Sequence, residues 1–428
     1  MLETLCFGIF FPTITKEMVL LYLVKKYQSI PLVYKMVTAM VLGVIVGAMM
    51  GHGAAWFAPL GKFFLTLLKV IALPLVIVNL IAGISSLDDP QAFGRIGGRI
   101  FVYYFLTSAL AMVVGVVLAG ILQPGVNFPL EGSYDGVVKE LPTISETLLD
   151  LIPSNIFKAM FEGRFDQVVV MSALAGIAVL LLPDGPRERL SVIFSDLSTM
   201  MSKVVSIIMI IAPYGIFALI ANSVGKYGDK IFGVLARYVA SVYIGIFAMC
   251  CVYGLCIYFM SDVGVKTFFR KASKLMITAF STCSSTSSIP INLECADKIG
   301  ISRKVSAFTI PLGAQVNKDG TSLTLAIVFM LTAQAIGASV DLAMLVKVIL
   351  LGLILTTGSG AIPSGMLVIL AILLESLGFP LEIVGIVAGV HAFNDMGMTM
   401  INCLSDLVGT TIVGRAEAKR LERIGKTE

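Results

Sequence analysis

The sequence is poor in charged residues, histidine and tryptophan. Only 14% of its 428 residues are Asp, Glu, Lys or Arg, while 57% are apolar. Because a soluble domain carries about 25% charged residues, a soluble globular fold is excluded. The 2 histidines, His52 and His391, are too few for a histidine-rich metal site. A net charge of +4 is too small to indicate a nucleic-acid partner, so none is expected.

Cysteine is also used sparingly, at 7 positions. None of these has the spacing of a metal site, and no pair lies in loops where a disulfide would be expected. A disulfide framework is therefore excluded, and no cofactor is expected.

Long apolar runs are the main feature of the sequence. Mean hydropathy is +0.95, and runs long enough to cross a bilayer recur. The sequence thus predicts an all-α polytopic membrane protein in the inner or plasma membrane, with the lipid bilayer as its solvent. The expected helices before residue 265 are 36–52, 60–85, 99–122, 166–183, 192–218 and 233–260.

Charge location predicts the orientation of the chain. The segments 184–189, 266–274 and 415–426 are basic, and the positive-inside rule puts them in the cytoplasm. The acidic, proline-containing stretch 123–165 then lies outside, and both termini are cytoplasmic. Residues 17–26 are typical of an amphipathic helix on the membrane surface, within an N-terminal segment 1–35.

After Lys274 the apolar runs are interrupted by small polar residues. The arms of 275–292 and 348–376 flank the sequences STCSSTSSIP and TTGSGAIPSG. Arms of this length enter the membrane only as half-helices, which indicates two re-entrant hairpins. Between them, helix 304–336 is broken at 315–321. Irregular backbone at membrane depth persists where it lines a cavity, so interrupted segments in matching positions predict a binding site.

One polar stripe follows the last apolar run. Asp395, Met398, Thr399, Asn402 and Asp406 fall on one face of a helix. Ionisable side chains at membrane depth cost several kcal/mol and face a protein interior or a wet cavity. A polar contact between helices is the alternative, but two carboxylates and an amide exceed what such packing needs.

Five blocks in this order resemble a known family. They are VYYFLTSALA at 102–111, the Ser284-Ser285-Thr286 tip before Pro290, PLGAQVNKDGT at 311–321, GSGAIPSG at 358–365, and DMGMTMIN with a later aspartate at 395–406. From about residue 36 to 415 the chain resembles the glutamate-transporter homologues, the dicarboxylate/amino acid:cation symporter family.

The resemblance implies a homotrimer of elevator-type transporters. Each subunit would hold about eight transmembrane helices and two re-entrant hairpins. Residues 36–98 and 124–222 would form a scaffold domain. Residues 99–123 and 223–414 would form a mobile transport domain, followed by a cytoplasmic tail at 415–428.

The resemblance also assigns site residues. Asp395 would bind a substrate ammonium and Asn402 its α-carboxylate, with the two hairpin tips completing the pocket. The expected substrate-binding residues are Ser284, Ser285, Thr321, Ile362, Gly365, Asp395, Met398, Thr399 and Asn402. One sodium site would use Gly313, Asn317, Asn402 and Asp406, and another Tyr104, Thr107, Ser108, Asn317 and Asp319. A third family site, formed largely by backbone oxygens, would involve Gln315, Thr356 and Ser359.

Several positions depart from the family pattern. Met398 stands where acidic-substrate members carry an arginine, and His391 where several carry its supporting aspartate. Cys283 replaces another arginine of some relatives, AIPSG at 361–365 replaces a more glycine-rich tip, and Lys318 replaces a methionine.

These departures favour a cation-coupled transporter of neutral amino acids, with up to two sodium ions and with Lys318 replacing another. Lys318 could instead carry a proton, or extend away from the sites. Acidic amino acid or dicarboxylate transport, by proton coupling or exchange, is the main alternative. An anion channel and an intramembrane enzyme using Ser284 or Ser285 with His391 or Asp395 are further alternatives. The chain has no nucleophile-elbow motif, and we expect no enzyme activity.

Overall fold

The computed structural model describes residues 32–85, 96–128, 130, 152–162, 165–228, 230–358 and 365–424. Within these ranges the regular structure is helical throughout, as the composition predicts. The elements are α2 Leu32–Met50, η1 Gly51–Phe57, α3 Ala58–Ser85, α5 Gly98–Leu122, α7 Ile156–Phe161, α8 Phe165–Leu180, α9 Asp184–Tyr227, α10 Lys230–Met260, α11 Val265–Thr282, α12 Ser285–Ile299, α13 Arg303–Val316, α14 Asp319–Ile336, α15 Leu342–Gly358, α16 Gly365–Ser376 and α17 Glu382–Ile424.

In these ranges, 6 helical stretches are long and apolar enough to cross a membrane. They are Tyr34–Phe64, Gly98–Leu122, Asp184–Tyr227, Lys230–Met260, Arg303–Ile336 and Glu382–Arg420. Shorter apolar helices include both arms of the second hairpin, α15 and α16. The chain is therefore a multi-pass helical membrane protein.

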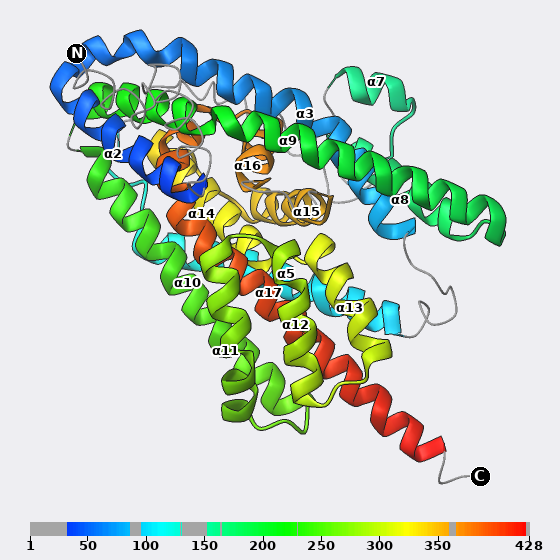
Figure 1. Cartoon of the computed structure of the whole chain (residues 1–428). Helices are drawn as coiled ribbons and strands as arrows, with labels where there is room; N and C mark the ends of the chain where they lie inside the picture. Colours follow the sequence, from blue (N-terminus) through cyan, green and yellow to red (C-terminus); the bar gives the residue numbers. More distant parts are fainter. Residues whose placement is uncertain are drawn as a thin grey trace, which may run out of the picture.

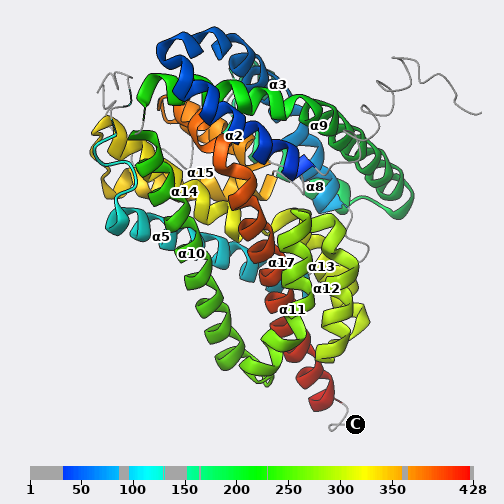
Figure 2. The ribbon, with the colours of Figure 1, turned by 60° about the vertical axis from the view of Figure 1, so that its left-hand side comes forward.

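The helices form two groups (Figure 1). Long helices α2, α3 and α9 lie side by side with α8, and glycines allow the close approach of α2 to α9. A Cβ at Gly43 or Gly47 would collide with the α9 backbone at Phe217 or Ala221. The second group contains α5 and α10 to α17, with α17 running between α10 and the α11–α13 segment (Figure 2).

Helix α14 is the most enclosed element of the second group. It packs along α5, where Gln334 Nε2 donates to Ala119 O at 2.8 Å and Gly125 N donates to Gln334 Oε1 at 3.0 Å. A Cβ at Gly115 would collide with Leu323 O, so the two backbones nearly touch. The amide of Gln334 therefore fixes the end of α5 against the end of α14.

Some expected boundaries were wrong. The basic segment 266–274, expected in the cytoplasm, lies inside α11, and the hairpin expected at 275–292 extends from 265 to 299. Residues 184–189 form the first turns of α9, and helix α17 continues ten residues beyond 414. Lysine and arginine are good helix formers, so a basic run places a segment relative to the membrane without ending its helix.

The expected N-terminal segment lies outside the described residues except for its last four positions, which already belong to α2. The scaffold and transport domain boundaries remain predictions.

Candidate functional site

The break in the long helix lies where the sequence predicts it. Helix α13 ends at Val316 and α14 begins at Asp319, with Asn317 extended at φ −89°, ψ 116° and Lys318 at φ −135°, ψ 51°. The carbonyl end of one half-helix and the amide end of the other thus meet inside the protein. Such helix ends carry opposite partial charges and are suited to binding ions.

Asp319 is buried and accepts four hydroxyl hydrogen bonds. Ser108 Oγ donates to Oδ1 at 2.7 Å and Thr107 Oγ1 to the same atom at 3.2 Å. Tyr253 OH and Ser405 Oγ each donate to Oδ2 at 2.7 Å. The structure therefore brings Thr107, Ser108 and Asp319 together, as predicted for one sodium site.

A second cluster surrounds Asp406. Asn317 Nδ2 donates to Asp406 Oδ1 at 2.9 Å. A Cβ at Gly313 would collide with the Asp406 carboxylate and with Tyr104 OH, so only glycine fits here. Asn402 lies one turn before Asp406 and accepts from Gly320 N at 2.8 Å. The predicted set of Gly313, Asn317, Asn402 and Asp406 thus surrounds the helix break.

Tyr104 does not join the hydroxyl donors around Asp319. Its OH donates to Thr309 O at 2.9 Å and lies beside Asp406, next to Gly313. Asn317 links the two clusters, because Ser108 Oγ lies 3.5 Å from Asn317 Oδ1 while the amide nitrogen binds Asp406. The two predicted sodium sets are therefore parts of one continuous polar network, with Tyr104 on the Asp406 side.

Asp395 has few partners. Its carboxylate is half-buried, and within the described ranges it accepts only the Thr399 hydroxyl, at 3.5 Å. Met398 on the same helix is 1% exposed, and its backbone meets α14 where a Cβ at Gly320 would collide with it. Within the described ranges Asp319 accepts four hydrogen bonds, whereas Asp395 and Asp406 accept one each, and Asp395 is the more exposed of these two.

The first hairpin tip is short. Cys283 adopts the left-handed conformation (φ 49°) at the end of α11, and Ser284 caps α12 by accepting from Ser287 N at 3.2 Å. The Ser284 hydroxyl is therefore used in the tip itself, whereas Ser285 is half-buried. Asn292 on the same arm donates to Cys403 O at 3.1 Å, which ties the hairpin to α17.

The second tip is partly outside the described residues, which exclude Ser359 and Ile362. Gly365 begins α16, and the buried Thr356 accepts from Ser322 Oγ at 3.3 Å. Thr321 is 7% exposed on the first turn of α14. Gln315 lines a separate cavity between α3, α5, α8, α13 and α15.

Lys318 is buried, with 5% of its surface exposed. Its ammonium donates to Ala314 O at 2.6 Å, a carbonyl in the last turn of α13. The side chain therefore turns inward to the helix break.

Sequence reasoning missed Tyr253 and Ser405. Ser405 directly precedes Asp406 in the sequence. It lies on a different helix face from the predicted polar stripe, so the spacing argument did not include it. Tyr253 lies in an apolar helix, where a buried hydroxyl needs a partner. His391 and Asn394 are also buried. Neither the two ring nitrogens of His391 nor the side-chain amide of Asn394 has a hydrogen-bond partner within the described part of the chain.

An all-helical membrane protein with hairpin tips and a broken helix around buried carboxylates has the architecture of a secondary transporter. The family model described as "Sodium:dicarboxylate symporter family" matches residues 32–416. The chain belongs to this family. Its members are symporters rather than enzymes, so the protein is a cation-coupled membrane transporter.

Named relatives cover nearly the whole chain. A "Proton/glutamate-aspartate symporter" from Escherichia coli (strain K12) is 29% identical, over 91% of this chain and 93% of the relative. A "Proton/sodium-glutamate symport protein" from Bacillus caldotenax is 28% identical, over 93% and 97%. A "C4-dicarboxylate transport protein" from Bacillus subtilis (strain 168) is 26% identical, over 92% and 96%.

Proposed function

We propose that the protein transports neutral amino acids, with Asp395 accepting the substrate ammonium. The open oxygens of Asp395 carry this proposal. A half-buried carboxylate with unfilled acceptor sites can take a charge-assisted hydrogen bond from a cationic donor, and such a bond is about twice as strong as a neutral one. Asn402 lies two turns further along α17 and would bind the α-carboxylate of the substrate.

The charges of the site support a zwitterionic substrate. Asp319, Asp395 and Asp406 provide three carboxylates, and Lys318 provides one ammonium, which is bonded to Ala314 O. With the two sodium ions proposed below these charges balance, so a substrate with a second carboxylate would leave the site with a net negative charge. Met398 offers no donor for that carboxylate, and burying it unpaired costs several kcal/mol.

We also propose that Lys318 acts as a tethered cation in place of one sodium ion. Its ammonium binds a carbonyl oxygen at the end of a half-helix, which is the kind of ligand that sodium takes in broken-helix transporters. The hydroxyl and carboxylate oxygens around Asp319 and Asp406 suit a hard cation, so these two places are the proposed sodium sites.

Transport of an acidic substrate is the second candidate. The names of the relatives include glutamate, aspartate and C4-dicarboxylates, and Lys318 is a buried cation beside the site. In this alternative the lysine would pair with the substrate side chain rather than replace an ion.

The arrangement as a homotrimer, the elevator motion and the cytoplasmic location of both termini are parts of the same proposal. Light scattering of the purified protein would test the trimer. Accessibility of single cysteines near each terminus, measured from both sides of the membrane, would test the orientation.

The substrate is tested by a thermal-shift screen of amino acids and dicarboxylates, with and without sodium. A ligand of the native state raises the unfolding temperature by mass action. Serine or alanine should stabilise the protein more than aspartate, and succinate should do little because it lacks an ammonium. Clearly tighter binding of aspartate would favour the second candidate, and counterflow of the best ligand in proteoliposomes would separate a carrier from a channel.

A further inference from the structure

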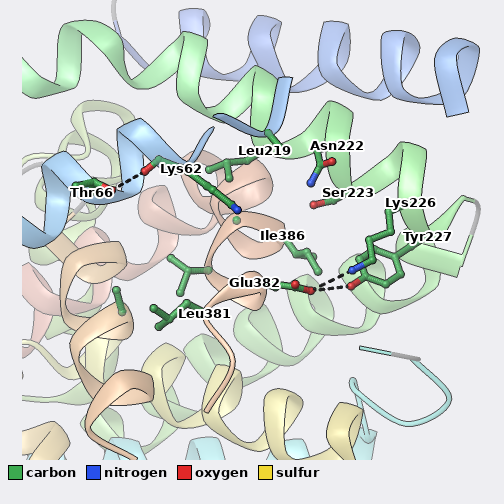
Figure 3. A pocket seen from close by; sticks show the side chains of 14 residues that line it. Lys62, Thr66, Leu219, Asn222, Ser223, Lys226, Tyr227, Leu381, Glu382 and Ile386 are labelled. Atoms are coloured by element: carbon green, nitrogen blue, oxygen red, sulfur yellow. Dashed lines mark hydrogen bonds and ion pairs between the residues drawn. The ribbon is translucent and has the colours of Figure 1, made fainter. Parts of the chain in front are cut away.

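A pocket lies between the two groups of helices (Figure 3), and Asp395 is not among its lining residues. It has a volume of about 340 Å³, which lies within the range of ligand sites. Its walls come from the start of α3, the end of α9, and α16 with the start of α17. Most of the lining is apolar, and includes Leu219, Leu381 and Ile386.

Lys62 provides a cation in this pocket. Lys62 is an exposed residue whose ammonium points toward α17 (Figure 3), and within the part of the chain that the structure describes this ammonium forms no ion pair or hydrogen bond. The neighbouring Glu382 does not neutralise it, because that carboxylate is taken by Tyr227 OH at 3.0 Å and Lys226 Nζ at 3.5 Å. The pocket thus presents a free positive charge beside an apolar wall.

The helix ends indicate the depth of the pocket. Lys62 lies in the second turn of α3, Lys226 and Tyr227 end α9, and Glu382 begins α17. Helix ends with charged and tyrosine side chains are typical of the boundary between hydrocarbon and head groups. A lysine at such a boundary extends its ammonium to the level of the head groups, where an anionic head group can pair with it.

We propose that this pocket binds an anionic phospholipid, with its phosphate at Lys62 and an acyl chain along Leu219, Leu381 and Ile386. Charge complementarity selects the head group, and the apolar wall selects a lipid over a free anion. The ligand comes from the bilayer itself, which supplies it at high local concentration. This site is distinct from the transport site and does not depend on the identity of the substrate.

The single tryptophan of the chain gives a direct readout. Trp56 is 82% exposed and lies two residues before Ala58, which lines the pocket. Brominated phosphatidylglycerol or brominated phosphatidylcholine would be added in small amounts to phosphatidylcholine proteoliposomes, and quenching of Trp56 measured. We expect anionic lipid to be enriched about fivefold over zwitterionic lipid, which corresponds to about 1 kcal/mol for one lysine.

Matched variants distinguish lipid binding in the pocket from a general effect of surface charge. Lys62→Gln should abolish the preference and Lys62→Arg should keep it. Lys230→Gln, which removes an exposed lysine at the start of α10, should leave it unchanged. Leu381→Phe keeps the lysine but narrows the pocket, and should reduce the preference. The unfolding temperature of each variant confirms that it is folded.

Two outcomes would overturn the proposal. One is equal quenching by both lipids, or a preference that Lys62→Gln and Leu381→Phe leave intact. The other is loss of the preference when inorganic phosphate is added at millimolar concentration, because the pocket would then bind a soluble anion rather than a lipid.

Discussion

Replacing Lys318 by methionine would change how the protein uses sodium. The ammonium donates to Ala314 O at 2.6 Å and is 5% exposed, so the variant loses a buried cation and keeps a side chain of similar length. A hydrogen bond to a charged group contributes about 1.5–3 kcal/mol. If a sodium ion takes over the vacated carbonyl, its apparent affinity should rise by roughly ten- to a hundredfold, because each 1.4 kcal/mol is about tenfold.

The assay is uptake of labelled serine or alanine into proteoliposomes over a sodium series. Lys318→Met should require sodium more steeply than the parent, since one more ion enters the cycle. Lys318→Arg retains a cation and should behave like the parent, provided that its larger head group fits. Because the lost ammonium also carried a desolvation cost, the methionine variant should fold with similar stability.

The reasoning is refuted if the parent and Lys318→Met show the same sodium dependence and neither responds to pH. Uptake by the parent that follows pH instead of sodium, with the response lost in Lys318→Met, would assign the lysine as a proton carrier.

Three further variants test the site. Asp395→Asn should abolish amino acid binding, measured by thermal shift, while the unfolding temperature without ligand stays close to that of the parent; a binding loss that only follows misfolding would make Asp395 structural. Met398→Arg should move selectivity toward aspartate by tenfold or more, because one new ion pair worth about 1.4 kcal/mol suffices. Met398→Leu is the control and should leave selectivity unchanged. Unchanged selectivity in a folded Met398→Arg variant would contradict the assignment of Met398 to the substrate pocket. Ser405→Ala removes one of four donors to Asp319 and should cost about 1–2 kcal/mol with weaker sodium binding. Its control is Ser241→Ala, because the Ser241 hydroxyl bonds Arg237 O in its own helix and no other group within the described residues. Equal effects in both variants would refute a special role for Ser405.

The elements of the site were predictable because their chemistry lies in consecutive residues. Asn317 and Lys318 interrupt an apolar run beside Gly313 and Gly320, so a broken helix followed directly. The stripe from Asp395 to Asp406 needed only helical spacing. The hairpin tip at Cys283 and Ser284 was predicted from small polar residues between apolar arms. The length of the hairpin was underestimated, because its first helix, α11, begins with basic residues.

The partners of these residues were decided by tertiary structure. Asp319 receives hydroxyls from α5, α10 and α17, and the position of Tyr253 depends on how α10 is rotated against α14. Tyr104 was assigned to one sodium set but lies beside Asp406, because the turn between it and Thr107 directs the two hydroxyls to different neighbours. Local sequence fixes which groups lie on one helix face, whereas the packing of distant helices fixes which carboxylate each group meets. Lys62 illustrates the same limit, since only the approach of α17 to α3 and α9 forms the pocket that this lysine lines.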